Sequence, residues 1–426
     1  MGMSGRYQTP RGTEDILPEE QPYWRAIRDA AEDVTRLFGY ERLDTPTFED
    51  AALFEKGTGD TTDIVEKEMY GFEDQGGESL SLIPEATPAI CRAYLEHGLA
   101  SRPQPVRLFT IARMFRYNRP QLGRLRQFNQ FDCEVLGSDT ALVDAELIEL
   151  HWRFYERLGL RDLEIRLGSI DDPEPRRAYL DRLRAYYLPL RDQLSEDSQR
   201  RLERNPLRLL DSNDPGDQAL REGAPTMIDA LSAEAREHFE GVKDALTAAG
   251  VPFVVDPLLV RGLDYYNRTV WEIVPKGDGR QQSSIGAGGR YDGLIETIGG
   301  KPTPASGFAT GLERVIIEMK RQELTLAEAG APDVFIVHAG EEGARGAVRA
   351  GADLRAAGFV TLLGESGRSF RAQLRRANGS GARFAVIIGE DEAARGVAAL
   401  KDLREEGEQE DVPLGEVAAR LGRELR

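Results

Sequence analysis

The sequence predicts a multidomain protein of mixed class, α+β over its first three quarters and α/β over its last quarter. Three observations support this. The chain of 426 residues is long enough for two or three domains. Strand-like segments pair as antiparallel neighbours before residue 325, whereas strands and helices alternate after it. The linker-like segment LTLAEAGAP separates the two patterns. We therefore expect one domain over residues 1–325, with a helical insertion over 171–250, and a second domain over 332–426.

Composition points to a soluble protein of the cytoplasm. Hydrophobic residues make up 40% and charged residues 30%, which is typical of globular chains. No apolar run is long enough for a membrane span, and the N-terminus lacks the apolar region of a signal peptide. With only two cysteines, a disulfide framework is not indicated. The four histidines are scattered without metal-ligand spacing, and we expect no resident metal.

The charge distribution is uneven. A net charge of −18 argues against indiscriminate nucleic-acid binding. Yet the stretch from Arg102 to Arg126 holds seven arginines and no acidic residue. This segregation favours an anionic ligand, although a solvated basic loop would also explain it.

The first elements place an acid and a hydroxyl in one turn. Residues 19–37 have helical periodicity, and GYERLDTPTFED after them resembles a strand ended by Pro46. Ordinary packing or a dimer-forming element would both fit this pair. Residues 80–83 predict a short strand and 89–97 a helix. Glu85 and Thr87 lie between them and suit an ammonium group, while Thr87 would also serve as a helix cap.

Residues 106–118 and 125–137 predict an antiparallel pair with a basic connecting loop. Period two gives the second strand an apolar face and a polar one. The apolar face carries Phe131, Cys133 and Val135, and the polar face carries Phe128, Gln130, Asp132 and Glu134. Polar groups in mid-strand suggest a binding surface, because buried acids need partners. Arg116 would project over the same face.

A helix over 142–158 and a strand over 163–168 precede the charged helical insertion. Two strands are then predicted, DPLLV over 256–260 and RTVWEIV over 268–274. The turn between them holds Arg261, Asp264, Tyr265 and Tyr266. Burying a guanidinium is costly unless an anion meets it. The turn is therefore either part of a ligand site or a surface hairpin with a salt bridge.

The remaining motifs concern glycines and a third arginine. Gly286, Gly288 and Gly289 lack dinucleotide-binding spacing and fit a strand that lies close to a ligand. Residues 307–311 predict a strand that turns into a helix. Arg314 in that helix would cover a flat base, reach a phosphate or simply face solvent.

The last quarter alternates strands and helices and predicts a mostly parallel sheet. The expected strands are 333–338, 360–363, 383–388 and 398–403, the expected helices are 342–357, 369–378 and 414–421, and a turn is expected at 405–411.

Five segments together resemble the histidyl-tRNA synthetase family of class II aminoacyl-tRNA synthetases. GYERLDTP resembles motif 1 of that class, FRYNRPQLGRLRQFNQFDCEVLG motif 2 and GFATGLERVII motif 3. LVRGLDYYNRTVWE and GAGGRYDGL resemble the two histidine-specific signatures. The resemblance covers nearly the whole chain. It implies a catalytic domain built on an antiparallel sheet, an anticodon-binding α/β domain, a homodimer, and ATP, Mg²⁺, L-histidine and tRNA(His) as substrates and partners.

The resemblance also assigns roles by position. It implies that Arg116, Arg261 and Arg314 are catalytic, and that the ATP site includes these arginines with Asn118, Phe128 and Gly311. It assigns the histidine pocket to Glu85, Thr87, Gln130, Glu134, Tyr266 and Tyr291. It assigns contacts with the tRNA acceptor end to Arg119, Gln121, Arg124 and Arg126. The basic segment 201–211 would clamp the acceptor arm.

Three positions depart from the family pattern: Ile83 and Asn118 stand where many relatives have Arg and Glu, and Trp271 replaces a common phenylalanine. The resemblance leaves alternatives. One is the synthetase-like regulatory subunit of ATP phosphoribosyltransferase, whose members usually lack the anticodon domain and degrade the RGLDYY loop. The others are a tRNA-binding protein that no longer charges and a ligase for another amino acid.

Overall fold

The computed structural model describes residues 7–59, 62, 64–210, 212, 214–277, 284–326, 330–404 and 409–425. The chain forms two compact units, Met1–Thr325 and Leu326–Arg426. Residues 60 and 61 of the 58–62 loop and residues 405–408 of the predicted turn lie outside the described residues. Within the described ranges, no helix has both the length and the apolar character that crossing a bilayer requires.

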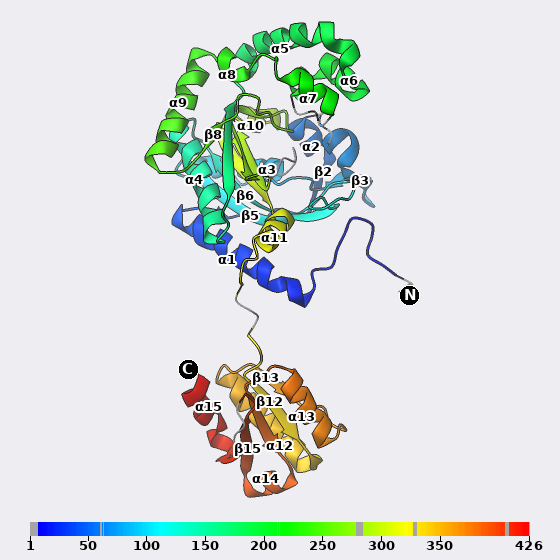
Figure 1. The fold of residues 1–426 in the computed structure, drawn as a ribbon, viewed down its shortest axis with the longest axis vertical. Helices are drawn as coiled ribbons and strands as arrows, with labels where there is room; N and C mark the ends of the chain where they lie inside the picture. The colour runs from blue at the N-terminus through cyan, green and yellow to red at the C-terminus, as the bar shows by residue number, and fades with distance from the viewer. Residues whose placement is uncertain are drawn as a thin grey trace. The chain divides into compact units, whose positions relative to one another are not determined.

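A large, mainly antiparallel sheet organises the first unit (Figure 1). Its strands run in the spatial order β1 (Glu41–Arg42), β5 (Val106–Phe115), β6 (Gln127–Leu136), β11 (Ala305–Gly311), β10 (Gly286–Arg290), β9 (Asn267–Pro275), β7 (Leu163–Ser169) and β8 (Val254–Val255). Only the edge pairs β1–β5 and β7–β8 are parallel in this sheet. The antiparallel sheet and the β5–β6 pair were both predicted, and both predictions are confirmed.

The two faces of this sheet differ as the alternation on β6 requires. Phe131 and Val135 are fully buried on the apolar face. Helix α4 (Ala141–Arg157) covers this face, with the Phe154 ring 5.0 Å from that of Phe131. Helices α1 (Gln21–Leu37) and α9 (Ala233–Ala248) pack on α4 in turn. With the apolar face closed by helices, the polar face is left to form a site.

The other elements of the first unit surround that polar face. A small sheet contains β2 (Phe48–Asp50), β4 (Ser79–Leu82) and β3 (Tyr70–Glu73). Helix α2 (Ala51–Thr58) packs on this small sheet, and α3 (Thr87–Glu96) and α10 (Leu294–Thr297) pack on α2. Helix α11 (Leu312–Arg321) contacts β6 and β11 of the large sheet. The segment predicted to be an insertion contains α5 (Pro173–Tyr187), α6 (Glu196–Arg204), α7 (Pro215–Arg221) and α8 (Met227–Ala230), which lie together in Figure 1.

Two predictions for the first unit are wrong. Residues 256–260 form no strand, and Val254–Val255 pair with β7 instead. Leu259 and Val260 are nevertheless buried, so their apolar character reflects packing of a turn. The strand expected to end at Pro46 is shorter than predicted: β1 covers only Glu41–Arg42, and β2 beyond the proline belongs to a different sheet. Pro46 lies between them, where its missing N–H disfavours a continuous strand.

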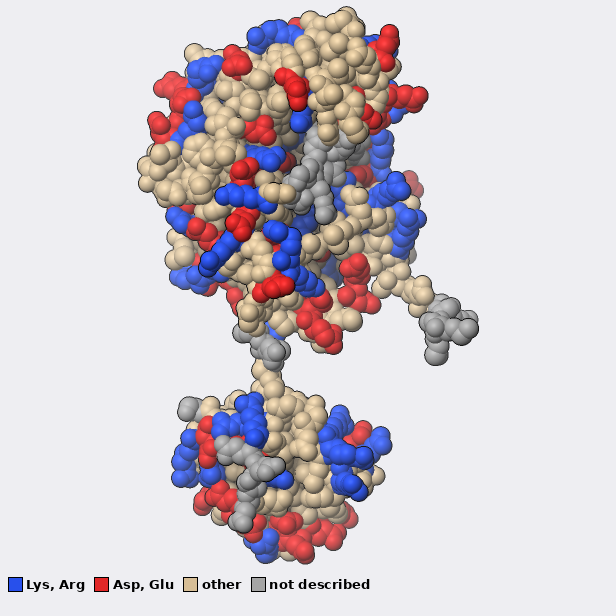
Figure 2. Space-filling view, viewed as in Figure 1, with Lys and Arg blue, Asp and Glu red and all other residues tan. Residues whose placement is uncertain are grey.

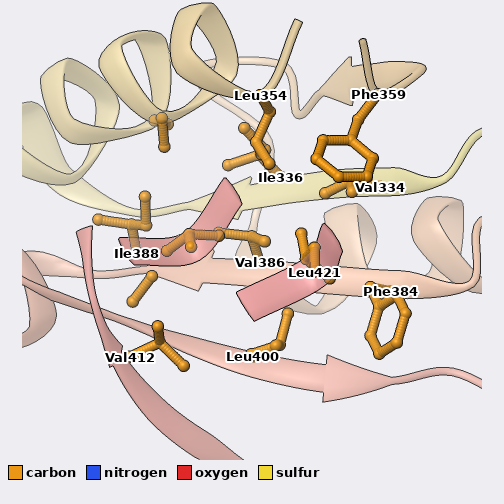
Figure 3. Packing of buried hydrophobic residues seen from close by; sticks show 14 residues of the cluster. Val334, Ile336, Leu354, Phe359, Phe384, Val386, Ile388, Leu400, Val412 and Leu421 are labelled. Carbon is orange, nitrogen blue, oxygen red and sulfur yellow. The ribbon is translucent and has the colours of Figure 1, made fainter. Parts of the chain in front are cut away.

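The second unit has one five-stranded sheet in the order β13 (Thr361–Leu363), β12 (Val334–His338), β14 (Phe384–Ile388), β15 (Val397–Asp402) and β16 (Glu410–Pro413). Its helices are α12 (Gly340–Ala356), α13 (Phe370–Gly379), α14 (Glu390–Arg395) and α15 (Val417–Leu425). Figure 3 shows its core, in which Ile336, Val386 and Leu400 of the sheet pack with Leu354 and Leu421 of the helices.

The prediction of a mostly parallel sheet holds for only part of this unit. Strands β13, β12 and β14 are parallel, whereas β15 and β16 are antiparallel to their neighbours. Only the short helix α14 connects β14 to β15, and a parallel crossover needs a dozen residues or more. Neither α14 nor β16 was predicted from the sequence, and β16 begins within the segment expected to be a turn.

A buried polar network beneath the large sheet involves Trp271, one of the departures from the family pattern. Its indole N–H donates to Nδ1 of His151 at 3.0 Å, and Nε2 of His151 lies 2.7 Å from Oγ1 of Thr310. Burial holds the pKa of His151 well below its ordinary value. The imidazole is therefore neutral, with its proton on Nε2.

We expect Trp271→Phe to lower the free energy of unfolding by about 2 kcal/mol, because Nδ1 of a buried histidine loses its donor and the smaller ring leaves a void. Urea denaturation measures this loss. Trp152→Phe is the matched control, since its indole donates to Glu156 near the surface. Equal stability of the two variants would show that the buried hydrogen bond contributes nothing.

Candidate active site

A cavity of about 410 Å³ opens on the polar face of the large sheet. Its wall is built from strands β6, β9, β10 and β11, helix α11, and the loop that precedes β9. Most of the residues singled out from the sequence line it: Glu85, Thr87, Arg116, Asn118, Arg124, Phe128, Gln130, Arg261, Tyr266, Tyr291, Gly311 and Arg314. Segments more than 200 residues apart in the chain thus form one site.

Two arginines and one aromatic ring form part of the cavity wall. Arg116 follows β5, and its Nε donates to the carbonyl oxygen of Pro84 at 2.8 Å. Its guanidinium carbon lies 5.5 Å from the centre of the Phe128 ring. Arg261 pairs with Glu272 of β9. A cation held beside an aromatic face is suited to a ligand that carries both a flat ring and negative charge.

Arg314 adds a third positive charge from the first turn of α11. Its Nε donates to the carbonyl oxygen of Gly123 at 3.1 Å, and Nη1 donates to that of Ser284 at 2.6 Å. Burial, reinforced by the charges of Arg124 and Arg116, lowers the pKa of Arg314 to about 10. A cation that is desolvated among other cations is stabilised by an incoming anion.

Buried carboxylates line the same cavity. Glu85 accepts hydrogen bonds from Oγ1 of Thr58 at 2.5 Å and from the Tyr265 hydroxyl at 2.9 Å. Burial raises its pKa, although the charge of Arg116 opposes the shift. Burial and the charge of Glu134 likewise raise the pKa of Asp132 well above its ordinary value. A ligand cation, such as an ammonium group, would relieve this repulsion.

Glu134 lies beneath the cavity wall and does not line the cavity. It is fully buried. One of its oxygens accepts from Oγ1 of Thr87 at 2.6 Å, and the other accepts from the hydroxyl of Tyr291. Thr87 and Tyr291 do line the cavity, so Glu134 acts on the cavity through these two hydroxyls. Burial raises the pKa of Glu134 to about 8, against the hydrogen bonds from Thr87 and Tyr291.

The raised pKa of Glu134 should make the stability of the protein depend on pH. A carboxyl group whose pKa is raised in the folded state binds more protons than in the unfolded state, so its contribution to stability falls as pH rises from about 4.5 to about 8. Glutamine at position 134 cannot ionise. We therefore expect the free energy of unfolding of Glu134→Gln, relative to that of the unaltered protein, to increase by up to about 1.4 kcal/mol for each pH unit in this range. Urea denaturation at pH 6 and pH 8 measures the difference. A difference that does not change with pH would contradict the raised pKa.

The hairpin loop between β5 and β6 is only partly in the cavity. Arg124 lines it, whereas Arg119, Gln121 and Arg126 do not. The Arg126 guanidinium lies 3.7 Å from the centre of the Tyr117 ring. The three side chains outside the cavity remain candidates for contact with a larger ligand.

Several lining residues were not assigned to the ATP or histidine site from the sequence: Asp132, Tyr265, Glu272, Glu313, Arg201 and Arg208. Period two on β6 placed Asp132 on the polar face, and that signal was sufficient to include it. Glu313 accepts from the backbone N–H of Asn129 at 2.9 Å and thereby joins α11 to β6. Nothing local to the insertion indicated that Arg208 would reach the cavity.

Comparisons with known proteins find similar chains and similar structures. The family model described as histidyl-tRNA synthetase matches residues 12–171 and 177–315, and that of an anticodon binding domain matches 333–424. A histidine–tRNA ligase of Dehalococcoides mccartyi is 48% identical over 98% of this chain and 100% of its own length. One of Moorella thermoacetica is 48% identical over 96% of each chain. The crystal structure of apo histidyl-tRNA synthetase from S. aureus is similar, with a TM-score of 0.80, 32% identity and coverage of 97% and 99% of the two chains.

Proposed function

The chain belongs to the histidyl-tRNA synthetase family of class II aminoacyl-tRNA synthetases, and from this premise we propose that its cavity activates L-histidine and charges tRNA(His). In the first step a carboxylate oxygen of histidine attacks the α-phosphate of ATP, which gives histidyl-adenylate and pyrophosphate. In the second step the 3′-terminal hydroxyl of the tRNA attacks the histidyl carbonyl and AMP leaves. The observation that carries the proposal is the convergence of three arginines and buried carboxylates in one cavity.

The arginines account for the ATP half of the site. Arg116 and Arg261 would hold the α-phosphate, where negative charge builds up in the transition state. Arg314 and Phe128 would enclose the adenine, with Gly311 and Asn118 beside them. Positioning of the attacking oxygen and stabilisation of phosphate charge are the main sources of rate in such a step.

The carboxylates account for the histidine half. Glu85, Thr87 and Gln130 would bind the α-ammonium group, while Tyr266 and Tyr291 would face the imidazole. Because the hydroxyls of Thr87 and Tyr291 both donate to Glu134, their oxygens would serve the ligand as hydrogen-bond acceptors. An amino acid without the ring N–H would leave a buried acceptor unpaired, which is how a polar pocket rejects it.

Mg²⁺ would enter with ATP as part of the substrate. Among the residues that the structure describes, no group of three or more His, Cys, Asp or Glu side chains is arranged to hold a metal ion. The donor set therefore does not fit a resident metal. The guanidinium of Arg261 supplies positive charge in the cavity instead.

Two basic surfaces would contact the tRNA. Arg119, Gln121, Arg124 and Arg126 in the β5–β6 loop would meet its acceptor end. In the second unit, Figure 2 shows Lys and Arg side chains gathered over α13, which carries Arg371, Arg375 and Arg376. In a chain of net charge −18, such local basic surfaces suit RNA phosphates. We further propose that the enzyme acts in the cytoplasm as a homodimer. Its dimer interface would bury the side chains of Leu37, Phe48 and Phe72, which are exposed in the single chain.

Histidine-dependent exchange of pyrophosphate into ATP tests the proposed activity. Exchange with histidine, but not with the other amino acids, is the expected result. The main alternative is the regulatory subunit of ATP phosphoribosyltransferase, and the match of residues 333–424 to an anticodon binding domain argues against it. A folded protein that binds histidine without catalysing exchange would favour that alternative.

A further inference from the structure

A second cavity, of about 210 Å³, adjoins the active site within the first unit. It lies between α5, the segment that joins α6 to the short helix Pro206–Leu209, and the loop before β9. Arg208, Arg261 and Leu263 line both cavities. The two spaces are therefore separated by side chains that contact both.

The second cavity is strongly basic. Its charged lining residues are Arg176, Arg184, Arg204, Arg208, Arg261 and Asp264. Among the described residues that line it, five guanidinium groups thus face one carboxylate, in a chain whose net charge is −18. Arg184, Arg204 and Arg261 form ion pairs with carboxylates that do not line this cavity. The lining itself is nevertheless mainly positive, which favours an anion inside it.

Arg176 carries a buried donor that the described residues leave unsatisfied. Its Nη2 donates to the carbonyl oxygens of Asp171 at 3.1 Å and Tyr266 at 2.9 Å. Its Nε is buried and has no hydrogen-bond acceptor among the described residues. Burial lowers the pKa of Arg176 in spite of nearby acidic groups, of which Asp172 is the strongest. A buried donor on a cation is costly to leave unpaired.

The lining also restricts the class of anion. Apart from the arginines, it consists of aliphatic, proline, asparagine and aspartate side chains, with no aromatic ring among the described lining residues. A nucleobase would find nothing on which to stack. Compact phosphate groups, by contrast, match the planar, multidentate donors that arginine provides.

We propose that this second cavity binds inorganic pyrophosphate as it leaves the active site. The inference rests on the proposed function, because adenylate formation releases pyrophosphate on the other side of Arg208 and Arg261. Pyrophosphate would pass from one set of guanidinium groups to the next along this shared wall. Its departure from the first cavity would separate it from histidyl-adenylate and so oppose reversal of the first step.

The test uses two double variants with the same loss of charge. Arg184→Gln/Arg204→Gln removes two arginines that line the second cavity but not the first. Their ion pairs with Asp181 and Glu66 are largely exposed and contribute little to stability. Arg182→Gln/Arg200→Gln is the matched control, with exposed arginines on the same two helices that line neither cavity.

In the exchange assay we expect the cavity variant to raise the KM for pyrophosphate about tenfold, as the loss of roughly one charge-assisted hydrogen bond would do. The KM values for histidine and ATP should stay within twofold of those of the unaltered enzyme. Calorimetric titration with sodium pyrophosphate should show the same weakening of Kd. The control variant should leave all of these values unchanged.

Three results would overturn the inference while leaving the proposed function intact. The first is an unchanged KM for pyrophosphate in the cavity variant. The second is an equal rise in both double variants, which would reflect overall charge. The third is a rise in the KM for tRNA alone, which would assign the cavity to an RNA phosphate. Absence of histidine-dependent exchange in the unaltered protein would instead refute the proposed function itself.

Discussion

Replacing Arg261 with alanine is expected to lower the rate of histidine-dependent pyrophosphate exchange by about a thousandfold, the usual cost of losing a preorganised group that meets transition-state charge. Arg261 lines the cavity, and its ion pair with Glu272 holds the guanidinium in place. Among the described residues, no group of acidic, histidine or cysteine side chains is arranged to bind a metal ion. The effect should fall on kcat, because the charge on the α-phosphate oxygens grows as the new bond forms. Initial rates of exchange at saturating histidine and ATP measure it.

Two further variants separate the role of Arg261 from general effects. Arg261→Lys keeps the charge but loses the planar fork, and we expect it to recover only part of the rate. Arg161→Ala removes an exposed arginine of the same unit that does not line the cavity, and it should exchange at the normal rate. A normal kcat in Arg261→Ala would show that Arg116 suffices for the α-phosphate.

The large sheet was predictable because its strands carry a local signal. Alternation on β6 fixed both its length and its two faces, and the buried Phe131 against Phe154 shows the consequence. The strand predicted at 256–260 was wrong because an apolar run indicates burial, and burial alone does not distinguish a strand from a packed turn. Strand β16 carried no local signal at all. Its acidic start is held in the sheet by pairing with β15, which a sequence pattern cannot reveal.

The site was predictable where a residue's chemistry conflicted with its surroundings. Arg116, Arg261 and Arg314 stood out because each interrupts an apolar or glycine-rich segment. Arg208 was noted only as part of a basic segment expected to contact the acceptor arm, because arginines on a charged helical insertion are usually solvated. Its Nη2 donates to the carbonyl oxygen of Gly262, 54 residues away, and only the tertiary fold brings these groups together.

The complete burial of Glu134 could not be predicted from the sequence either, because it depends on a glycine of the neighbouring strand. Gly307 lies directly opposite Glu134 in the β11–β6 register. A Cβ atom at this position would lie 1.5 Å from Oε2 of Glu134 and 2.8 Å from the carbonyl oxygen of Cys133. Only a residue without a side chain leaves room for the carboxylate between the strands. Sequence periodicity gave the face of Glu134 but not this close approach.

We therefore expect Gly307→Ala to reduce histidine-dependent exchange about a hundredfold or more, because the Glu134 carboxylate must leave Thr87 and Tyr291 or the strands must separate. The free energy of unfolding should fall by about 1–3 kcal/mol, as in other overpacked cores. Exchange assays and urea denaturation of the same preparation measure the two effects.

The second-site variant Gly307→Ala/Glu134→Ala distinguishes the pocket from the fold. Removing the carboxylate relieves the closest contact, so most of the lost stability should return while exchange stays low. Gly293→Ala is the matched control, because its added methyl group would meet no heavy atom within 4 Å among the described residues and the position is exposed. Normal exchange in Gly307→Ala would mean that the buried position of Glu134 is unnecessary for histidine activation. Recovery of both stability and exchange in the double variant would assign Glu134 a purely structural role.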